Sequence, residues 1–386
     1  MGLWQRSLEN LVTYQQPLGA ILETAYRGRT VLVTGHNGFV GSWLSLVLEH
    51  SGAQVVGLAL PAEQGGLAEC VGLSARVSSL EGDINELSFV DEAVAKYEPD
   101  IVFHLAAQAL VLPSYTDPLA TISTNVIGTA HVLDAIRRHP SAKACIIITS
   151  DKCYATAESA HVESDKLGGE DPYSASKAAA EIIAHSYRSS FFSLSGPGIA
   201  TARAGNIVGG GDWADSRVVP DCIRAIREGQ PVLLRHPEAV RPWQHVLDAI
   251  AGYLRLGDAL VRDRASYAQA WNFGPPPEAA RTVGEFVDAL LSSWNGHGGI
   301  AKAPAYLSTA ELPERTFLTL DSSKARELLD WHQLLNFDET IDWTTSWYLP
   351  FIQSDNFDGF TTTVTQIERY LELDRSDRLE PPRTRS

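Results

Sequence analysis

Short runs that are apolar at almost every position alternate with longer, helix-like stretches between residues 30 and 209. The runs lie at 30–35 (TVLVTG), 54–60 (QVVGLAL), 100–107 (DIVFHLAA), 144–150 (ACIIITS) and 198–209 (GIATARAGNIVG). Strands that are apolar throughout are typical of parallel sheets buried on both faces, and the helical stretches between them supply the crossovers. The pattern therefore predicts an α/β fold with a doubly wound, Rossmann-type parallel sheet.

The alternation breaks down after residue 209, where the glycine-rich string GGGDWADSR is followed by isolated helix-like stretches. We expect an N-terminal extension over 1–28, a main domain over 29–209, a smaller C-terminal lobe covering most of 210–350 and a C-terminal segment over 351–386. The chain ends in DRSDRLEPPRTRS, which is charged and contains prolines. Such a string has almost no residues for a core, so this tail is predicted to be disordered.

Charge and cysteine content narrow the classes of partner. A net charge of −16 over 386 residues disfavours binding to nucleic acid or to an anionic membrane surface, so an anionic ligand needs a local group of arginines. The four cysteines form no CxxC pair, and no run reaches the ~20 apolar residues of a membrane span. The cysteine spacing predicts no metal site. The N-terminus also lacks a basic start followed by an apolar run, so we expect a cytoplasmic protein.

The first predicted strand ends in TGHNGFVGSW, a GxxGxxG spacing before an apolar helix. Glycines let the backbone approach a pyrophosphate, and the N-terminus of the helix supplies free N–H groups with a partial positive charge. A plain turn is the alternative, but the preceding strand and the following helix favour a dinucleotide site in the 29–209 domain. The residues expected to contact the cofactor here are Gly35, Asn37, Gly38, Phe39, Val40 and Gly41.

Two further loops are predicted to lie along the dinucleotide. The string GDI places Asp83 and Ile84 near the adenine, although an aspartate at this point can equally be a turn residue. The end of the 54–60 run has neither an acidic ribose ligand nor an arginine for a 2′-phosphate, and the missing arginine favours NAD over NADP. The strand at 100–107 ends in the other expected cofactor contacts, Leu105, Ala106, Ala107 and Gln108.

The string DPYSASK combines a helix start with a tyrosine–lysine pair. Asp171 is a suitable N-cap and Pro172 suits the first helical position, so Tyr173 and Lys177 should lie on one face of a helix. An ammonium group near a tyrosine stabilises the phenolate and lowers its pKa, so both residues are expected to serve catalysis and to contact the cofactor. A solvated surface pair is the alternative, but the dinucleotide motif upstream favours a catalytic pair.

The order of these motifs resembles the extended short-chain dehydrogenase/reductase (NAD-dependent epimerase/dehydratase) family over about residues 28 to 350. Longer strings, including GHNGFVGSWLS, TSDKCY, GGEDPYSASK, RAGNIVGGGDW and RPWQHVL, resemble the CDP-glucose 4,6-dehydratases of that family. The resemblance implies oxidation of the sugar at C4 by hydride transfer to NAD, loss of water across C5 and C6, and return of the hydride to C6. It also implies a homodimer or homotetramer.

The resemblance assigns roles to individual residues. Tyr173 is the implied base, Ser150 its hydroxyl partner and Lys177 the tuning cation. Asp151 is the implied acid for the departing C6 hydroxyl, and Lys152 stands where dTDP-glucose dehydratases carry a glutamate that removes the C5 proton; a structural Asp–Lys ion pair is the alternative. The implied contacts to the nucleotide sugar, several from the C-terminal lobe, are Gln108, Arg203, Asn206, Asp212, Trp213, Arg217, Arg241 and His245.

The chain departs from the family near the expected substrate. The loop after TSDKCY is the shortened string ATAESAHVESDK at 155–166, and Leu112 replaces a family arginine. A dehydratase of a different nucleotide sugar and a nucleotide-sugar C4 epimerase therefore stay open, as does a non-catalytic NAD-binding protein. An epimerase has no use for Asp151 and Lys152, and a binding protein has none for Ser150, Tyr173 and Lys177, so dehydration is favoured.

Overall fold

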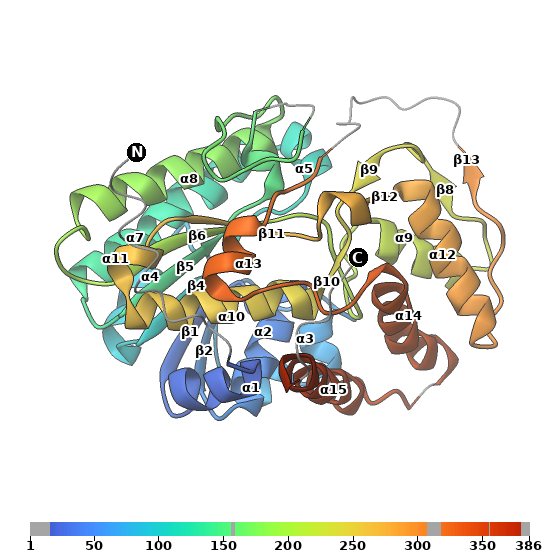
Figure 1. Cartoon of the computed structure of the whole chain (residues 1–386), viewed down its shortest axis with the longest axis horizontal. Helices are drawn as coiled ribbons and strands as arrows, with labels where there is room; N and C mark the ends of the chain where they lie inside the picture. Colours follow the sequence, from blue (N-terminus) through green and yellow to red (C-terminus); the bar gives the residue numbers. More distant parts are fainter. Residues whose placement is uncertain (1–15, 156–158, 307–317, 355, 380–386) are drawn as a thin grey trace.

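The computed structural model describes residues 16–155, 159–306, 318–354 and 356–379. Its centre is a seven-stranded, fully parallel sheet in the order β11-β6-β5-β4-β1-β2-β3 (Figure 1). The strands are β1 (Thr30–Thr34), β2 (Gln54–Ala59), β3 (Ser78–Glu81), β4 (Ile101–His104), β5 (Ala144–Ile148), β6 (Gly198–Ala204) and β11 (Ala270–Phe273). The predicted doubly wound α/β fold is confirmed.

Helices cover both faces of this sheet, which explains why its central strands are apolar at successive positions. In β1, Val31 and Val33 pack into one core and Leu32 into a second core on the opposite face. The first face carries α1 (Leu18–Ile21), α2 (Phe39–His50), α10 (Val246–Arg262) and α15 (Gly359–Leu379). The second face carries α4 (Leu87–Tyr97), α6 (Pro118–Ile122), the π-helix η4 (Ser123–Gly128), α7 (Thr129–Arg138) and α8 (Pro172–Ser190).

A smaller group of elements lies beyond one end of the sheet (Figure 1). It contains α9 (Val218–Arg227), α12 (Val283–Gly296), α14 (Phe337–Gln353) and the two-residue strand pairs β8 (Leu233–Leu234) with β13 (Ala305–Tyr306) and β9 (Val240–Arg241) with β12 (Arg281–Thr282). The remaining α-helices and strands are α3 (Leu67–Cys70), α5 (Val111–Thr116), α11 (Arg264–Tyr267), α13 (Ser323–Leu329), β7 (Ile207–Val208) and β10 (Gln244–His245). The short helices are η2 (Leu22–Tyr26), η3 (Leu73–Ala75), η5 (Asp151–Cys153) and η6 (Pro277–Ala279).

The boundary expected at residue 209 does not coincide with the end of the sheet. Strand β11 pairs with β6, and α10 packs against β5 and β6, so two segments of the expected lobe return to the main layer. Both β3 and β11 were absent from the predicted strands. Three of the four residues SSLE of β3 are polar, and the run AWNF of β11 is short and lies among helical stretches, so neither has the continuous apolar pattern.

The C-terminal tail is more ordered than predicted. Helix α15 extends to Leu379, and the buried Asp374 accepts a hydrogen bond of 2.9 Å from Arg255 on α10. The prediction of disorder is therefore wrong for 374–379, while 380–386 lie outside the described residues. The N-terminal extension packs on the same helix, since the hydroxyl of Tyr26 donates to the carbonyl of Leu254 over 2.7 Å. None of the described helices is long and apolar enough to cross a membrane.

Candidate active site

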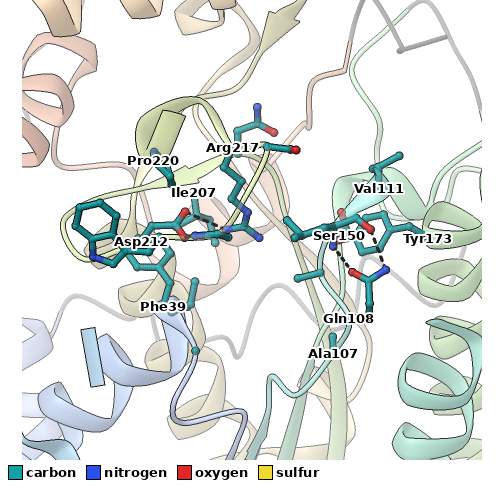
Figure 2. A pocket seen from close by; sticks show the side chains of 18 of the residues that line it. Phe39, Ala107, Gln108, Val111, Ser150, Tyr173, Ile207, Asp212, Arg217 and Pro220 are labelled. Carbon is teal, nitrogen blue, oxygen red and sulfur yellow. Dashed lines mark hydrogen bonds and ion pairs between the residues drawn. The ribbon is translucent and has the colours of Figure 1, made fainter. Parts of the chain in front are cut away.

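A cavity of about 1650 Å³ opens at the carboxyl ends of the parallel strands. Its walls come from the turn after β1, the loops after β4 and β5, the start of α8, the segment 204–221 and strand β8. The sheet order reverses between β1 and β4, and the crevice outside such a reversal is the usual ligand site of a doubly wound fold. Figure 2 shows two groups of side chains facing each other across this space.

The glycine turn has the shape that a dinucleotide requires. Gly35 has a φ of +74°, and a Cβ atom there would lie 2.7 Å from the backbone nitrogen of Ala106. A Cβ on Gly41 would lie 2.1 Å from the carbonyl oxygen of Gly35, so α2 begins in direct contact with the turn. No side chain caps the N-terminus of α2 at Gly38, which leaves its first N–H groups for an anion. These residues fit the pyrophosphate of NAD.

All the residues predicted to contact the cofactor line this cavity, and the side chains of several, including Asn37, Asp83 and Gln108, already have hydrogen-bond partners within the protein. Asp83 accepts hydrogen bonds from the backbone and side-chain nitrogens of Asn85 over 2.9 and 3.0 Å, as a turn residue does. Gln108 donates to the carbonyl of Leu110 and to the hydroxyl of Thr121. The other lining residues of this set are Gly35, Asn37, Gly38, Phe39, Val40, Gly41, Ile84, Leu105, Ala106, Ala107, Tyr173 and Lys177.

The helix side of the cavity, formed by Ser150, Asp151, Tyr173 and Lys177, is built by β5 and α8. Ser150 lies two residues after the end of β5, and its hydroxyl accepts a hydrogen bond from the backbone nitrogen of Lys152. Asp171 caps α8 as predicted, accepting from the backbone nitrogen of Ser174 over 2.9 Å. The spacing within α8 then places Tyr173 and Lys177 on one face, and Tyr173 lies beside Ser150 (Figure 2).

Burial governs the protonation of the tyrosine and the lysine. It raises the pKa of Tyr173 to about 12, an effect that a hydrogen bond with Ser150 partly opposes. Burial also lowers the pKa of Lys177 to about 8, and its Nζ donates to the carbonyl of Ile148 over 3.4 Å. Desolvation of the phenolate outweighs the favourable charges near Tyr173, so the expected net lowering of its pKa is not found.

Asp151 is a buried carboxyl group with a free oxygen. Its side chain is 3% exposed, its Oδ1 accepts from the hydroxyl of Ser150 over 3.0 Å, and its Oδ2 has no hydrogen-bond partner within the described structure. Burial raises the pKa of Asp151, and the ammonium of the half-buried Lys152 opposes that rise. Gly205 makes this position possible, since a Cβ there would lie 2.9 Å from Oδ2. The carboxyl can thus hold a proton at the cavity wall.

The loop side of the cavity carries positive charge on Arg217 and Arg241. The guanidinium of Arg217 lies 3.3 Å from Oδ2 of Asp212 and is 32% exposed, while Arg241 is buried in β9. Arginine side chains here supply the local positive charge that an anionic ligand of this acidic protein needs. Asp212 and Arg217 lie across the cavity from Ser150 and Tyr173 (Figure 2). The other predicted substrate residues that line the cavity are Asn206 and Trp213, with Gln108 on the opposite wall.

Two predicted substrate residues do not line the cavity. Arg203 is 4% exposed and donates to Oε2 of Glu181 over 2.7 Å and to the hydroxyl of Tyr154 over 2.8 Å, so it serves a buried network. His245 caps α10 and lies near the rings of Trp43 and Trp343, where burial lowers its pKa to about 3. The side chains of Arg203 and His245 are both turned into the core, so both residues serve the structure of the protein.

The shortened loop is folded onto the buried network. Tyr154 stacks on His161 with ring centroids 4.4 Å apart, and Nδ1 of His161 lies 3.0 Å from Oδ2 of Asp165. Oε1 of Glu163 accepts from the backbone nitrogen of Asn272 over 2.9 Å, which ties the loop to the edge strand β11. Residues 156–158 lie outside the described part. Leu112, which stands in place of a family arginine, lines the cavity within α5.

Several cavity residues carried no signal in the sequence. Leu233, Arg235 and His236 line the loop side from and just after β8, a strand of two residues. Glu63 lines the opposite end, after β2. A two-residue strand has no periodicity, so the one available clue was the nearness of Arg235 to the string RPWQHVL.

Several known proteins are similar to this chain in sequence or in fold. The CDP-glucose 4,6-dehydratase of Salmonella typhimurium strain LT2 is 41% identical over 340 residues, which are 86% of this chain and 93% of that protein. The structure of MoeE5 in complex with UDP-glucuronic acid and NAD has a TM-score of 0.70 at 26% identity, covering 82% of this chain and 98% of that one. The dTDP-glucose 4,6-dehydratase DesIV from Streptomyces venezuelae has a TM-score of 0.72 at 22% identity, covering 83% and 96%, and shares the fold.

The model of the NAD dependent epimerase/dehydratase family matches residues 31–272, which include the glycine turn, Ser150 and the tyrosine–lysine pair. The prediction of NAD as the cofactor is confirmed at the level of this family, whose description names it. The resemblance drawn from the motifs is confirmed as well: this chain belongs to the NAD-dependent epimerase/dehydratase family.

Proposed function

We propose that this protein is an NAD-dependent nucleotide-sugar 4,6-dehydratase that converts CDP-glucose to CDP-4-keto-6-deoxyglucose. The observation that carries the proposal is the buried Asp151, whose free Oδ2 lies at the same cavity wall as Ser150 and Tyr173. Elimination of water needs a proton donor beside the sugar, and a desolvated carboxyl group is suited to that task. The 41% identity to a CDP-glucose 4,6-dehydratase supports the same substrate.

The chain supplies the proton transfers of this reaction. Tyr173 takes the proton of the sugar C4 hydroxyl, with Ser150 hydrogen-bonded to it and Lys177 on the same helix face. Asp151 gives its proton to the C6 hydroxyl, which leaves as water, and Lys152 at the cavity wall is placed to take the C5 proton. The glycine turn from Gly35 to Gly41 would hold NAD, which would supply the hydride acceptor for C4 and the hydride donor for C6. The proton taken by Lys152 returns to C5 as the hydride reaches C6, and the proton taken by Tyr173 replaces the one that Asp151 gave. Hydride and protons then balance, with one water lost.

A nucleotide-sugar C4 epimerase is the second candidate, because the fold and the tyrosine–lysine pair suit it equally well. Such an enzyme keeps every atom of the sugar and needs no acid beside C6. The desolvated Asp151 with its free oxygen therefore favours elimination over epimerisation. A non-catalytic NAD-binding protein would need neither Asp151 nor the buried Tyr173 and Lys177.

We also propose that the protein is a cytoplasmic homodimer. The four cysteines are free, which suits a reducing compartment. Large apolar side chains are exposed on α6 and α8, helices that pack against each other on the second face of the sheet: Leu119, Ile122 and Ile182. An apolar face of this kind suits a second copy of the chain. Light scattering after gel filtration should give twice the chain mass, and Ile182→Glu should shift the protein toward the monomer.

The direct test incubates the purified protein with NAD and, separately, CDP-glucose, dTDP-glucose and UDP-glucose, and measures product mass. We expect a product lighter by one water from CDP-glucose in preference to the other two. Turnover to a product of unchanged mass would contradict the dehydratase proposal and support the epimerase. Preferred water loss from another nucleotide sugar would support the proposed reaction but contradict CDP-glucose as the substrate.

A further inference from the structure

The loop 209–217, which carries Asp212 and Arg217, is held in place by side chains from three helices. The indole nitrogen of Trp43 on α2 donates to the carbonyl of Gly210 over 2.9 Å. The hydroxyl of Tyr348 on α14 donates to the carbonyl of Asp212 over 2.6 Å. Arg224 on α9 donates to the carbonyl of Trp213 over 2.9 Å. Three successive stretches of this loop therefore rest on three different helices.

This loop cannot set its own conformation. It lies between β7 and α9 and contributes no strand to any described sheet. Gly211 has a φ of +82° and Ser216 a φ of +61°, both in the left-handed region, which costs free energy for a residue with a side chain. Backbone of this kind persists only where surrounding groups fix it. The direction of Arg217, which follows Ser216, thus depends on the anchors from outside the loop.

Tyr348 is the anchor that acts on the acidic partner of Arg217. Its ring is fully buried and meets the ring of Trp213 edge-on with centroids 5.5 Å apart. Burial and the nearby Asp212 carboxylate raise its pKa well above the usual value for tyrosine, so the hydroxyl remains a donor. The bond to the Asp212 carbonyl fixes the residue whose carboxylate lies 3.3 Å from the guanidinium of Arg217.

The neighbouring residue on α14 strengthens this contact. A Cβ on Gly210 would lie 2.0 Å from the ring of Trp347, so the loop passes directly over that indole. The indole nitrogen of Trp347 donates to the hydroxyl of Thr363 on α15 over 2.9 Å. The loop therefore rests on α14, which α15 holds from behind, although neither helix contributes a residue to the cavity wall.

We propose that Tyr348 is a positioning residue for the diphosphate of the substrate: it holds Asp212 so that the Asp212 carboxylate directs the Arg217 guanidinium into the cavity. The inference rests on the proposed function in one respect, that the ligand is a nucleoside diphosphate sugar. It adds a residue of α14, 136 positions from Asp212 in the chain, to the determinants of substrate affinity.

The test compares Tyr348→Phe with Tyr253→Phe. Both tyrosines are buried, but the hydroxyl of Tyr253 has no hydrogen-bond partner in the described structure, so its removal is the matched control. For Tyr348→Phe we expect KM for CDP-glucose and Kd for cytidine diphosphate to rise about five-fold, the value of one hydrogen bond, with kcat and Kd for NAD near wild type. Tyr253→Phe should leave all four constants near wild type.

Unchanged KM and Kd in Tyr348→Phe, or an equal rise in Tyr253→Phe, would overturn the inference. If the wild-type protein does not bind cytidine diphosphate at all, the proposed function and the inference both fall. If it binds and Tyr348→Phe binds equally well, only the inference falls.

A double-variant comparison separates positioning from general loosening of the fold. If Tyr348 acts through Arg217, then Tyr348→Phe added to Arg217→Ala should raise KM little beyond Arg217→Ala alone. An additional five-fold rise in the double variant would contradict the proposal. Asp212→Asn tests the second link even if Tyr348→Phe is poorly folded, because it keeps the carbonyl that Tyr348 binds and removes the carboxylate charge that faces the Arg217 guanidinium. Its KM should rise by a similar factor, and an unchanged KM would refute the mechanism.

Discussion

The two sides of the cavity are built in different ways. On the helix side, Ser150 lies two residues after a central strand, and Tyr173 and Lys177 belong to α8, a helix of 19 residues. Regular elements of the fold therefore set their positions. On the loop side, Asp212 and Arg217 lie on an irregular segment held by side chains of three helices. Rigid elements thus carry the groups that move protons, and an anchored loop carries the groups that hold the ligand.

The side chains on the helix side of the cavity are also more deeply buried than Arg217 on the loop side. Tyr173, Lys177 and Asp151 are almost fully buried, and desolvation shifts the pKa of each. Arg217 is one-third exposed and lies where a ligand can displace water from it. Changes on the helix side should therefore lower kcat, and changes on the loop side should raise KM.

The largest effect expected on the helix side is that of Tyr173→Phe. Removal of the hydroxyl takes away the proton acceptor for the C4 hydroxyl, and kcat should fall by about 10²–10⁴-fold. The appearance of the 4-keto-6-deoxy product, followed by mass, measures it, with Kd for NAD unchanged. Tyr115→Phe, an exposed tyrosine in the same cavity, is the control and should retain kcat. A Tyr173→Phe variant that keeps a tenth of wild-type kcat would remove the distinction between the two sides.

Asp151→Asn should have the next largest effect. The amide keeps the size of the side chain but has no proton to give to the leaving hydroxyl, so the rate of water loss should fall about 10²-fold. Substrate affinity should change little, because Asp151 is not a positive group. Asp215→Asn, on an almost fully exposed side chain, is the control. Equal water loss by Asp151→Asn and wild type would mean that another group protonates the C6 hydroxyl.

Arg217→Ala changes the loop side of the cavity, so it should raise KM and leave kcat nearly unchanged. Loss of a charge-assisted hydrogen bond to a phosphate should raise KM for CDP-glucose by roughly 10- to 100-fold, with kcat within about three-fold of wild type. Steady-state kinetics with saturating NAD separate the two constants. Arg137→Ala removes a surface ion pair on α7 and should leave KM unchanged. A loss confined to kcat would show that Arg217 serves the chemistry and not the binding.

The sequence predicted the helix side far better than the loop side, and the reason is distance along the chain. Tyr173 and Lys177 are four residues apart on one helix, and Ser150 follows an unbroken apolar run, so local patterns contain their geometry. Tyr348 and Asp212 are 136 residues apart, and nothing in either string indicates the contact. Arg203 was predicted to contact the substrate because its string matches the family. Its side chain instead pairs with Glu181, a residue that no motif included.

The same reasoning applies to the fold. The five continuous apolar runs gave five of the seven strands of the main sheet, since burial on both faces leaves a clear pattern. Strand β3 is at one edge and has a single apolar residue, and β11 is at the other edge and is reached only after the chain leaves the main layer. Edge strands have weaker patterns because one side or one face is less enclosed, and so the sequence did not reveal them.

The smallest expected effect is a shift of the pH profile through Glu181, a positioning residue one turn beyond Lys177 on α8. Burial lowers the pKa of Lys177 to about 8, and the charge of Glu181 opposes that lowering. If the protonated lysine is required, kcat should fall as pH rises through about 8. Glu181→Gln removes a charge that raises the pKa of Lys177, so the pKa should fall further and the alkaline limb should move to lower pH, by roughly half a unit to one unit.

Lys177→Arg gives this prediction its internal control. A guanidinium stays protonated far above pH 8, so whatever activity the variant retains should lose the alkaline limb near pH 8. Profiles of kcat between pH 6 and 10, with circular dichroism to verify folding at each pH, measure both variants. An unmoved limb in Glu181→Gln would mean that the group titrating near pH 8 is not Lys177. A moved limb would show that a charge buried behind the helix side adjusts the pKa of Lys177, whereas the loop side depends on the side chains that hold its backbone.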